Sequence, residues 1–497
     1  MSKKYLDEYD DDVIPAPQPW KPVKYMKKGM EWLLSHSAAG LFIPPGLRKT
    51  SITLGAIKML GKQGASVRTL VIAPLRPCYG VWDSENPRSE LRKWIDFHDL
   101  SSVVLHGSRK EKKFQELIQS DKQIAVINPE GLQWLMTEGR FKALRPDTLV
   151  IDESTKFKND RSQRSKTLAP RLNDFRRRWI LTGTPSPNGL LDLFGQTKVL
   201  DGGHSLGTFY SHFRAKYFVP TGYGGFTWVL RKGAEKEIYA ALRTMVLRID
   251  EEEAGIELPK LIDHPIYVRL PEDARKVYDS MEEELIARVS SGVITAANAA
   301  VASGRCSQIA NGGLYLPAKL DKNGIPIKGK RQWEHIHEAK IDACEELCEE
   351  LGEDKAVLMT YDYEHDLDRL RQRFGDIPAI GGDTNPTTSR AIERDWNAGR
   401  IKKLAIHPGS THGLNPQEGG NHLAWVSLTF NYEHYEQTWR RLVRSGQKTK
   451  RVFNHLFIAE DTVDEAKMVS LRRKERGQNA LLDALRRYAA RRQKGSV

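Results

Sequence analysis

The sequence predicts an α/β protein made of two halves, each containing a parallel sheet flanked by helices. Short apolar runs rich in β-branched residues alternate with amphipathic segments. This pattern is typical of parallel strands covered on both faces by helices. This pattern stops near residue 190 and resumes near residue 260. Two halves of similar size are therefore expected on either side of a different, mostly helical segment.

Size and composition agree with a globular protein of several domains. The chain has 497 residues, of which 39% are hydrophobic and 28% charged, so about two to four domains are expected. No apolar run approaches the roughly 20 residues that span a bilayer, and the first residues lack an apolar signal core. We therefore expect no contact with a membrane.

Cysteine usage and net charge indicate the compartment and the partner. The four cysteines have neither zinc-ligand nor disulfide-framework spacing, which favours a reduced, cytoplasmic interior. The net charge of +13 indicates an anionic partner, most often nucleic acid. Many soluble proteins are mildly basic, however, and charge alone leaves both interpretations open.

The first half opens with an acidic, proline-containing lead-in, residues 1–19, that has no apolar core of its own. A helix is predicted over residues 23–35, followed by a strand that leads into a glycine-containing loop. The later strands of this half are predicted at residues 69–73, 124–128, 148–152 and 179–182.

The loop after the first strand has the pattern of a phosphate-binding loop. It reads Gly46-Leu47-Arg48-Lys49-Thr50-Ser51 and opens a helix. In such loops backbone N–H groups surround phosphate oxygens at a helix N-terminus, a lysine reaches the outer phosphates, and a hydroxyl binds Mg²⁺. Arg48 stands where a glycine is usual, because backbone and phosphate nearly touch at that position.

Two later strands of this half end in groups suited to ATP chemistry. Asp152 and Glu153 end the strand at 148–152; in phosphate-loop ATPases the first acid holds Mg²⁺ and the second activates the attacking water. Thr182, Gly183 and Thr184 follow the next strand and could couple the acids to the neighbouring domain. A chance acidic pair and a hydroxyl-rich surface turn are the alternatives, and the order of these motifs favours the ATPase interpretation.

The segment between the halves is predicted to be helical at residues 190–199, 204–213 and 234–246, with a glycine- and aromatic-rich piece at 217–228. The second half then resumes with strands, predicted at residues 262–270, 356–360, 403–407, 424–428 and 452–458.

Gln437, Arg441 and Arg444 are spaced four and then three residues apart, which places them on one face of a helix. Such a face could stabilise charge on a γ-phosphate across an interdomain cleft, as an arginine finger does; a solvated helix face is the alternative. Residues 479–494 form a predicted basic helix, which is either a solvated terminal helix or a contact for DNA or a partner.

The order of these motifs resembles the Swi/Snf-type branch of superfamily-two helicases, and more narrowly its compact phage- and bacterium-encoded members. The resemblance covers about residues 20–470. It implies two RecA-like domains with ATP and Mg²⁺ bound between them, duplex DNA as the partner, and a cytoplasmic location in a bacterial cell or a phage-infected host. Most members of the branch translocate on duplex DNA.

The resemblance also assigns expected roles to positions of this chain. Glu153, Arg441, Arg444 and Gln437 are implied to be catalytic, Thr50 and Asp152 to hold the metal, and Thr182, Gly183 and Thr184 to couple the domains. Nucleotide contacts are implied for Gly46, Leu47, Arg48, Lys49, Thr50, Ser51, Tyr25, Met26 and Gly413. DNA contacts are implied for Pro74, Arg76, Asn128, Lys156, Lys158, Thr360, Tyr361, His407 and Ser410.

The expected domain limits follow from the pattern of strands and helices together with this family resemblance. They are a lead-in at 1–19, an ATP-binding domain at 20–190, a helical insertion at 191–260, a second RecA-like domain at 261–470 and a basic C-terminal helix at 471–497.

Three positions depart from the family pattern. Arg48 replaces the loop glycine, Met26 stands where the family often has the glutamine that reads adenine, and Pro416 follows Asn415 where an apolar residue is usual. Losing the glutamine could loosen nucleotide selectivity. Arg48 could block the phosphate or strain the backbone, or turn outward and leave the loop working.

The main hypothesis is a DNA-dependent ATPase that moves on duplex DNA, including branched or forked DNA, with protein partners as a means of targeting. The first alternative is a DNA-binding protein of the same fold in which Arg48 has impaired ATP turnover. A strand-separating or strand-annealing helicase is the second alternative.

Overall fold

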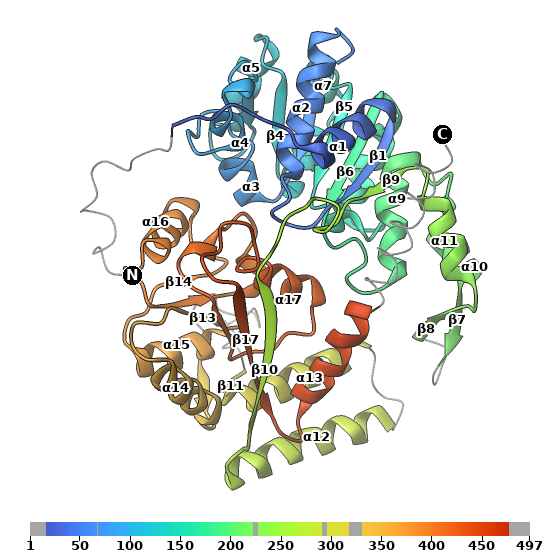
Figure 1. The fold of residues 1–497 in the computed structure, drawn as a ribbon. Coiled ribbons are helices and arrows are strands. Elements are labelled where there is room, and N and C mark those ends of the chain that lie inside the picture. The colour runs from blue at the N-terminus through green and yellow to red at the C-terminus, as the bar shows by residue number, and fades with distance from the viewer. Residues whose placement is uncertain (1–15, 67, 222–226, 291–295, 318–330, 477–497) are drawn as a thin grey trace, which may run out of the picture. The chain divides into compact units, whose positions relative to one another are not determined.

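The computed structural model describes residues 16–66, 68–221, 227–290, 296–317 and 331–476. The chain divides into two compact units, one made of residues 1–257 with 474–497 and the other of residues 258–473. Each unit contains its own parallel sheet (Figure 1). The predicted α/β class with two parallel sheets is therefore confirmed.

The first unit is organised around a seven-stranded sheet in the order β3-β4-β2-β5-β6-β1-β9, with every neighbouring pair parallel. Its strands are β1 (Ala38–Phe42), β2 (Thr69–Ile72), β3 (Ser102–Val104), β4 (Ile124–Ile127), β5 (Thr148–Asp152), β6 (Arg177–Thr182) and β9 (Val246–Arg248). Alternate residues of a strand enter different cores: Leu149 and Ile151 face one, and Val150 faces the other. Both faces of the sheet are thus covered.

Helices supply the two covering layers of this unit. One core receives residues of α1 (Lys24–Ser35), α2 (Lys49–Lys62), α3 (Leu75–Gly80) and α4 (Glu90–Lys93). The other receives residues of α5 (Lys110–Ile118), α6 (Leu132–Leu135), α7 (Glu138–Leu144), α8 (Gln163–Leu168), α9 (Leu193–Asp201), α10 (Tyr210–Tyr217) and α11 (Ala234–Leu242).

The segment between the predicted halves is predicted to be mostly helical; its described residues contain three α-helices but also strands, and its element limits differ from the prediction. The predicted helix at 204–213 begins only at Tyr210, because Gly203 and Gly207 both have positive φ angles that interrupt a helix. The predicted helix at 234–246 ends at Leu242, because Val246 instead pairs with Gly40 as the start of edge strand β9. Between them, β7 (Phe218–Thr221) and β8 (Thr227–Leu230) form an antiparallel pair.

The second unit contains a six-stranded parallel sheet in the order β10-β17-β16-β13-β15-β14. The strands are β10 (Lys260–Val268), β13 (Val357–Thr360), β14 (Ala379–Ile380), β15 (Lys403–Ile406), β16 (His422–Trp425) and β17 (Arg451–Ala459). One core receives α16 (Pro386–Asn397) and α17 (Tyr432–Trp439), and the other receives α14 (Ala339–Leu351) and α15 (Glu364–Phe374).

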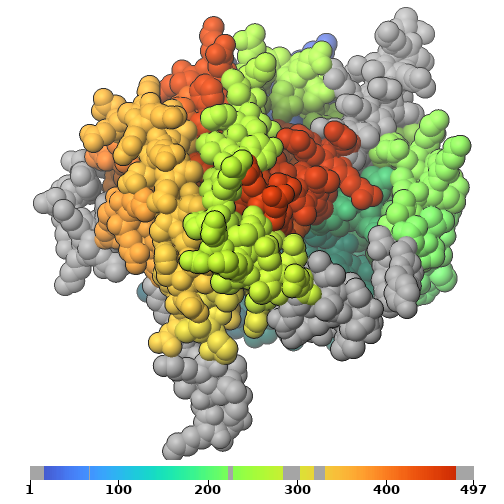
Figure 2. Space-filling model, turned by 90° about the horizontal axis from the view of Figure 1, so that it is seen from below, coloured from blue at the N-terminus to red at the C-terminus, as the bar shows by residue number. Residues whose placement is uncertain are grey.

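Two further helices and a small ribbon complete the second unit. They are α12 (Glu272–Ser290), α13 (Ala296–Asn311), and the antiparallel pair β11 (Gly313–Tyr315) and β12 (Trp333–His335). Figure 2 shows the yellow-green segment that includes α12 beside the red segment at the end of the described chain. Arg275 of α12 donates from Nη1 to the Asp461 carbonyl at 2.9 Å, and the Val463 N–H donates to the Tyr278 hydroxyl at 2.7 Å.

Two predicted segments fall at the ends of the chain. Most of the lead-in, residues 1–15, and the predicted basic helix at 479–494 lie outside the described residues. Within the described part of the chain, no helix combines the length and apolar character needed to cross a bilayer. All four cysteines are buried free thiols.

Three histidines form a row across neighbouring strands of the second unit. His455 of β17 lies with its Nδ1 atom 3.1 Å from Nδ1 of His264 and its Nε2 atom 3.0 Å from Nδ1 of His422, each pair sharing a hydrogen bond. Burial lowers the pKa of His422 to about 4, with Lys355 adding repulsion. Burial, followed by the charges of His422 and His264, lowers the pKa of His455 to about 3.

This row predicts that acid destabilises the second unit. In the unfolded chain His422 and His455 bind protons near pH 6.5, whereas in the folded chain their pKa values are lowered to about 4 and about 3. The stabilising contribution of these two unprotonated histidines is fully present above pH 7. It is lost as the pH falls from about 6.5 toward 4. Between pH 7 and pH 5 the loss from His455 alone is about 2 kcal/mol. Urea unfolding at the two pH values should show a smaller difference for His455→Gln than for the unmodified chain; an equal difference would contradict the prediction.

Candidate active site

The predicted site residues of the first unit gather at one edge of its sheet. β1, β2, β4, β5 and β6 are parallel members of that sheet, so the segments that follow them begin at the same edge. These segments are the glycine-containing loop, the residues around Pro74 and Arg76, the Asn128 turn, the acidic pair and the Thr182–Thr184 turn. Parallel topology therefore brings together motifs that lie more than one hundred residues apart.

The loop after β1 has the backbone of a phosphate-binding loop and a lysine directed at it. Gly46 has a φ of 90°, and α2 begins at Lys49. The Lys49 ammonium donates to the Ile43 carbonyl at 2.7 Å, which holds it over the loop. Thr50 follows on the first turn of the helix and is partly exposed. The residues present thus fit a bound phosphate chain with a metal ion at the Thr50 hydroxyl.

Arg48 adopts a left-handed conformation, with φ 54° and ψ 36°, and its side chain is exposed. A non-glycine residue in this region costs roughly 1–2 kcal/mol. The guanidinium carbon lies 5.0 Å from the ring centroid of Trp94. The structure therefore shows one feature of each predicted possibility, a strained backbone and an exposed side chain.

The Thr182–Thr184 turn packs directly against the phosphate-binding loop. The Ile43 N–H donates to the Thr182 carbonyl at 2.9 Å, and the Thr184 N–H donates to the Thr182 hydroxyl at 3.1 Å. A β-carbon added at Gly183 would stand 2.7 Å from Cδ of Pro45 and 3.3 Å from the Ile43 carbonyl oxygen. The turn is therefore in contact with the loop, as a coupling element needs to be.

Gly183→Ala is expected to displace the loop and lower ATP affinity, with a loss of stability of about 1–3 kcal/mol from overpacking. Isothermal titration with an ATP analogue and thermal unfolding measure the two effects. Gly139→Ala is the matched control, because nothing lies within 4 Å of a β-carbon added there and alanine favours the α7 helix. Equal ATP affinity for Gly183→Ala and the unmodified chain would contradict the expected effect of this turn on the phosphate-binding loop.

The acidic pair at the end of β5 is positioned by hydrogen bonds and an unusual backbone. Trp82 donates from Nε1 to Oδ2 of Asp152 at 3.0 Å. Glu153 has φ 58° and ψ 65°, a left-handed conformation that is costly for this residue type and typical of functional sites. Both side chains are partly exposed, so each is accessible to a ligand.

The remaining residues expected to contact nucleotide differ in accessibility. Leu47 and Ser51 are buried, and so are Tyr25 and Met26, with Met26 only 1% exposed in the core between α1 and the sheet. Burial raises the pKa of Tyr25, and the nearby positive charge of Arg48 acts in the opposite direction. Met26 thus serves as a core residue here, and it offers no polar group to a base.

The residues expected to contact DNA in the first unit lie around the same sheet edge. Pro74, Arg76, Lys156 and Lys158 are partly exposed. Asn128 is buried and donates from Nδ2 to Oε2 of Glu130 at 2.8 Å. The exposed basic groups could meet a phosphate backbone, whereas Asn128 orders its own turn.

In the second unit, the predicted helix through Gln437, Arg441 and Arg444 is wrong in its extent. The α17 helix ends at Trp439, and the chain continues in turns in which the N–H groups of Leu442 and Val443 both donate to the Trp439 carbonyl at 3.0 Å. The two arginines nevertheless converge. Nη1 atoms of Arg441 and Arg444 donate to the Leu414 carbonyl at 3.4 and 3.2 Å.

The arginines are supported by the Gly413–Asn415 loop and a partly exposed carboxyl group, that of Glu393. Arg444 also donates to Oδ1 of Asn415 at 2.6 Å, and Gly413 has a φ of 76°. Glu393 of α16 accepts from the Asn415 N–H at 2.7 Å. Burial raises the pKa of Glu393, which this hydrogen bond and the charges of Arg444 and Arg441 oppose. The side chain of Gln437 is buried within α17.

The other predicted DNA-contacting residues of this unit follow β13 and β15. Thr360, Tyr361 and Ser410 are buried, whereas His407 keeps a partly exposed ring 3.5 Å from Oδ1 of Asp362. The Thr360 hydroxyl donates to the Ser427 carbonyl at 3.2 Å. His407 and Asp362 are thus the accessible polar groups among these side chains.

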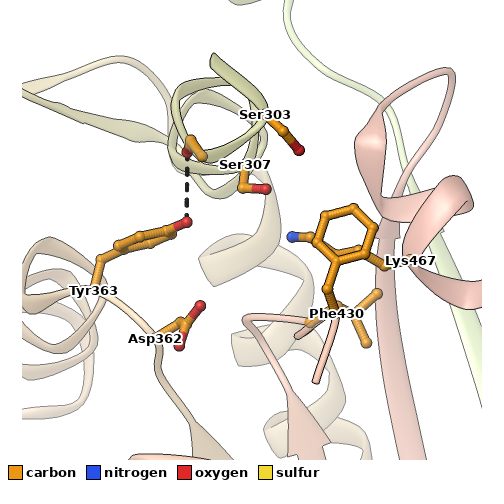
Figure 3. A pocket seen from close by; sticks show the side chains of 8 residues that line it. Ser303, Ser307, Asp362, Tyr363, Phe430 and Lys467 are labelled. Atoms are coloured by element: carbon orange, nitrogen blue, oxygen red, sulfur yellow. Dashed lines mark hydrogen bonds between the residues drawn. The ribbon is translucent and has the colours of Figure 1, made fainter. Parts of the chain in front are cut away.

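A pocket of about 380 Å³ opens beyond β13 and β16 of the second unit (Figure 3). The Tyr363 hydroxyl donates to the Gly304 carbonyl at 3.4 Å and closes one side. The Lys467 ammonium donates to Oδ1 of Asp464 at 3.0 Å and lies 5.8 Å from the Phe430 ring centroid. The polar and aromatic lining includes Ser303, Ser307, Asp362, Tyr363, Phe430 and Lys467.

Several supporting residues were missed by sequence reasoning. Buried Gln196 accepts from the Ser154 hydroxyl at 2.7 Å and donates to the Pro185 carbonyl at 2.6 Å, so it links the acidic motif to the threonine turn. Arg248 donates to the Phe42 carbonyl at the base of the phosphate loop at 2.9 Å. These contacts, like those of Trp82 and Trp94, have no local sequence signal because their partners are distant in the chain.

Comparison with known proteins gives a consistent set of relatives. The SNF2-related domain profile matches residues 25–312. Protein p41 of Acyrthosiphon pisum secondary endosymbiont phage 1 is 33% identical over 480 residues, which cover 94% of this chain and 99% of p41. Helicase SWR1 of Mycosarcoma maydis is 28% identical over 272 residues, which cover 51% of this chain but only 14% of SWR1.

Among solved structures, the SWI2/SNF2 ATPase core of Sulfolobus solfataricus in complex with double-stranded DNA is 21% identical, with a TM-score of 0.42. The match covers 91% of this chain and 90% of that chain.

Proposed function

The chain belongs to the SNF2-related family, within the Swi/Snf-type branch of superfamily-two helicases, and we propose that it hydrolyses ATP with Mg²⁺ to move along duplex DNA. The predicted family is confirmed by the profile match over residues 25–312. The observation that carries the proposed activity is the gathering of the phosphate-binding loop, the acidic pair and the threonine turn at one sheet edge.

The proposed roles follow from the chemistry of the residues at that edge. Lys49 would hold the outer phosphates, and Glu153 would take the proton of the attacking water. Mg²⁺ would bind Thr50, Asp152 and phosphate oxygens, because it commonly uses one or two protein ligands besides substrate phosphates. Within the described residues no cluster of three or more His, Cys, Asp or Glu side chains forms a metal site, which agrees with a metal held largely by the nucleotide.

Duplex DNA is the proposed partner, and the cytoplasm the proposed location. The proposal of a DNA partner is supported by the net charge of +13 and by the partly exposed side chains of Arg76, Lys156 and Lys158 at the sheet edge. Contacts of this type bind the phosphate backbone, so they give affinity that falls with salt and little sequence preference. Forked or branched DNA and protein partners are further candidates for targeting.

Displacement of a third strand from a triplex-containing duplex tests the proposed movement. The full chain with ATP and Mg²⁺ should release the third strand, and the non-hydrolysable analogue should not. A forked duplex with a labelled strand tests the alternative, a strand-separating helicase. Release from the fork without release from the triplex would favour that alternative and refute duplex translocation.

The second candidate function is a DNA-binding protein with impaired turnover, favoured by the strained Arg48 at the crowded point of the loop. Arg48→Gly separates the two. If Arg48 impairs turnover, the glycine variant should hydrolyse ATP faster than the unmodified chain. Equal rates, with both proteins binding DNA, would show that the loop works with arginine in place.

A further inference from the structure

We infer that Trp94 is a positioning residue that holds the Arg48 side chain away from the phosphate-binding loop and so keeps the loop open to ATP. The inference rests on the proposed ATPase function and explains how the loop tolerates an arginine. Its basis is the contact between the two side chains, with the guanidinium carbon 5.0 Å from the Trp94 ring centroid. A guanidinium at this distance from an indole is attracted by the ring quadrupole.

The ring of Trp94 is held in place by contacts other than the one with Arg48. The residue is only 4% exposed. Its indole Nε1 donates to Oε2 of Glu90 at 2.7 Å. On either side of it, the Gln18 N–H donates to the Lys93 carbonyl and the Ile95 N–H donates to the Gln18 carbonyl, both at 2.9 Å. The lead-in segment therefore anchors the backbone that carries the ring.

Arg48 stands at a position from which its cationic side chain could also reach the space over the phosphate-binding loop. The residue lies at the last loop position before α2 in a left-handed conformation, and its positive charge opposes the raised pKa of Tyr25, a buried residue of α1. A long cationic side chain at this position, if not held by an aromatic ring, could fold over the loop where the backbone must approach a phosphate. The fixed indole offers the guanidinium a competing site outside that space.

The test compares Trp94→Leu in two backgrounds, the unmodified chain and the Arg48→Gly variant. Steady-state ATP hydrolysis is measured with the full chain and saturating duplex DNA. With Arg48 in place, Trp94→Leu should raise KM for ATP about three- to tenfold, the range expected for a lost cation–π contact, while kcat changes less than about twofold. In the Arg48→Gly background, the same substitution should change KM less than about twofold.

Two further variants separate positioning from a general loss of structure. Trp94→Phe keeps an aromatic face and should restore most of the ATP affinity lost in Trp94→Leu. Lys93→Met removes the other cation near the same ring, whose Nζ lies 5.1 Å from the centroid, and should leave KM within about twofold. Thermal unfolding of every variant identifies any that do not fold.

An unchanged or lower KM in folded Trp94→Leu would overturn the inference, and so would an equal rise in both backgrounds. The two backgrounds, each with and without Trp94→Leu, are also titrated with a fluorescent non-hydrolysable ATP analogue. If no variant hydrolyses ATP, the proposed ATPase function fails; the dissociation constants, compared between backgrounds in the same way, still support or overturn the role of Trp94.

Discussion

Glu153→Gln is expected to lower DNA-stimulated ATP hydrolysis by about 100-fold or more, because general base catalysis contributes roughly 10²–10⁴ in rate. Glutamine keeps the size of the side chain but cannot accept the proton of the attacking water. ATP binding should persist, since the loop and Lys49 are unchanged. Phosphate release measures the loss, and a fluorescent ATP analogue measures the retained binding.

The control for Glu153→Gln is Glu116→Gln on α5, an exposed residue 60% accessible in its side chain, which should hydrolyse ATP like the unmodified chain. A Glu153→Gln variant with more than about one tenth of the normal rate would exclude this residue as the general base.

Replacing Arg441 or Arg444 by alanine is expected to lower kcat by about 100-fold or more, since arginine fingers contribute roughly 10³–10⁵ in related phosphoryl transfers. Both side chains converge on the Leu414 carbonyl, which suggests that they act as a unit. The double variant should therefore lose little more than either single variant. Single-turnover hydrolysis separates this loss from a change in ATP affinity.

Arg440→Ala is the neighbouring control for the arginine pair. Its Nε atom donates to Oε1 of Glu436 at 2.8 Å. The folded variant should keep a rate within about threefold of normal, while its stability falls because Glu436 loses this buried ion pair. Equal losses in Arg440→Ala and Arg441→Ala would mean that the segment matters only for folding.

Long apolar strands were predictable because their pattern is local. β5 (Thr148–Asp152) has the predicted bounds, and β17 (Arg451–Ala459) extends the predicted strand by one residue at each end. By contrast, β3, β9 and β14 have only two or three residues each. Strands this short are stabilised by pairing with neighbours, as Val246 pairs with Gly40, and a single segment carries little sign of that pairing.

The motifs of the candidate site could be recognised in the sequence. The residues that contact and support these motifs could not. The phosphate loop, the acidic pair and the threonine turn each carry a local signal. The extent of the arginine helix was misjudged because residue spacing alone does not show where a helix ends, and α17 ends at Trp439. Glu393, Gln196 and Trp94 contact residues distant in sequence, so only the folded chain reveals them.

Arg48 illustrates the same limit. From the sequence, a side chain at the crowded point of the loop could block the phosphate or turn outward. In the structure the side chain is exposed and lies against the buried indole of Trp94, and its backbone has a strained left-handed conformation. A working motor is therefore the function we propose.

Phosphate release by the unmodified full chain, measured with ATP and Mg²⁺ in the presence and absence of duplex DNA, tests this proposal most directly. We expect hydrolysis that rises severalfold when duplex DNA is added and that disappears in Glu153→Gln. Hydrolysis that does not respond to DNA, or is absent while DNA binding is intact, would contradict an ATP-driven motor.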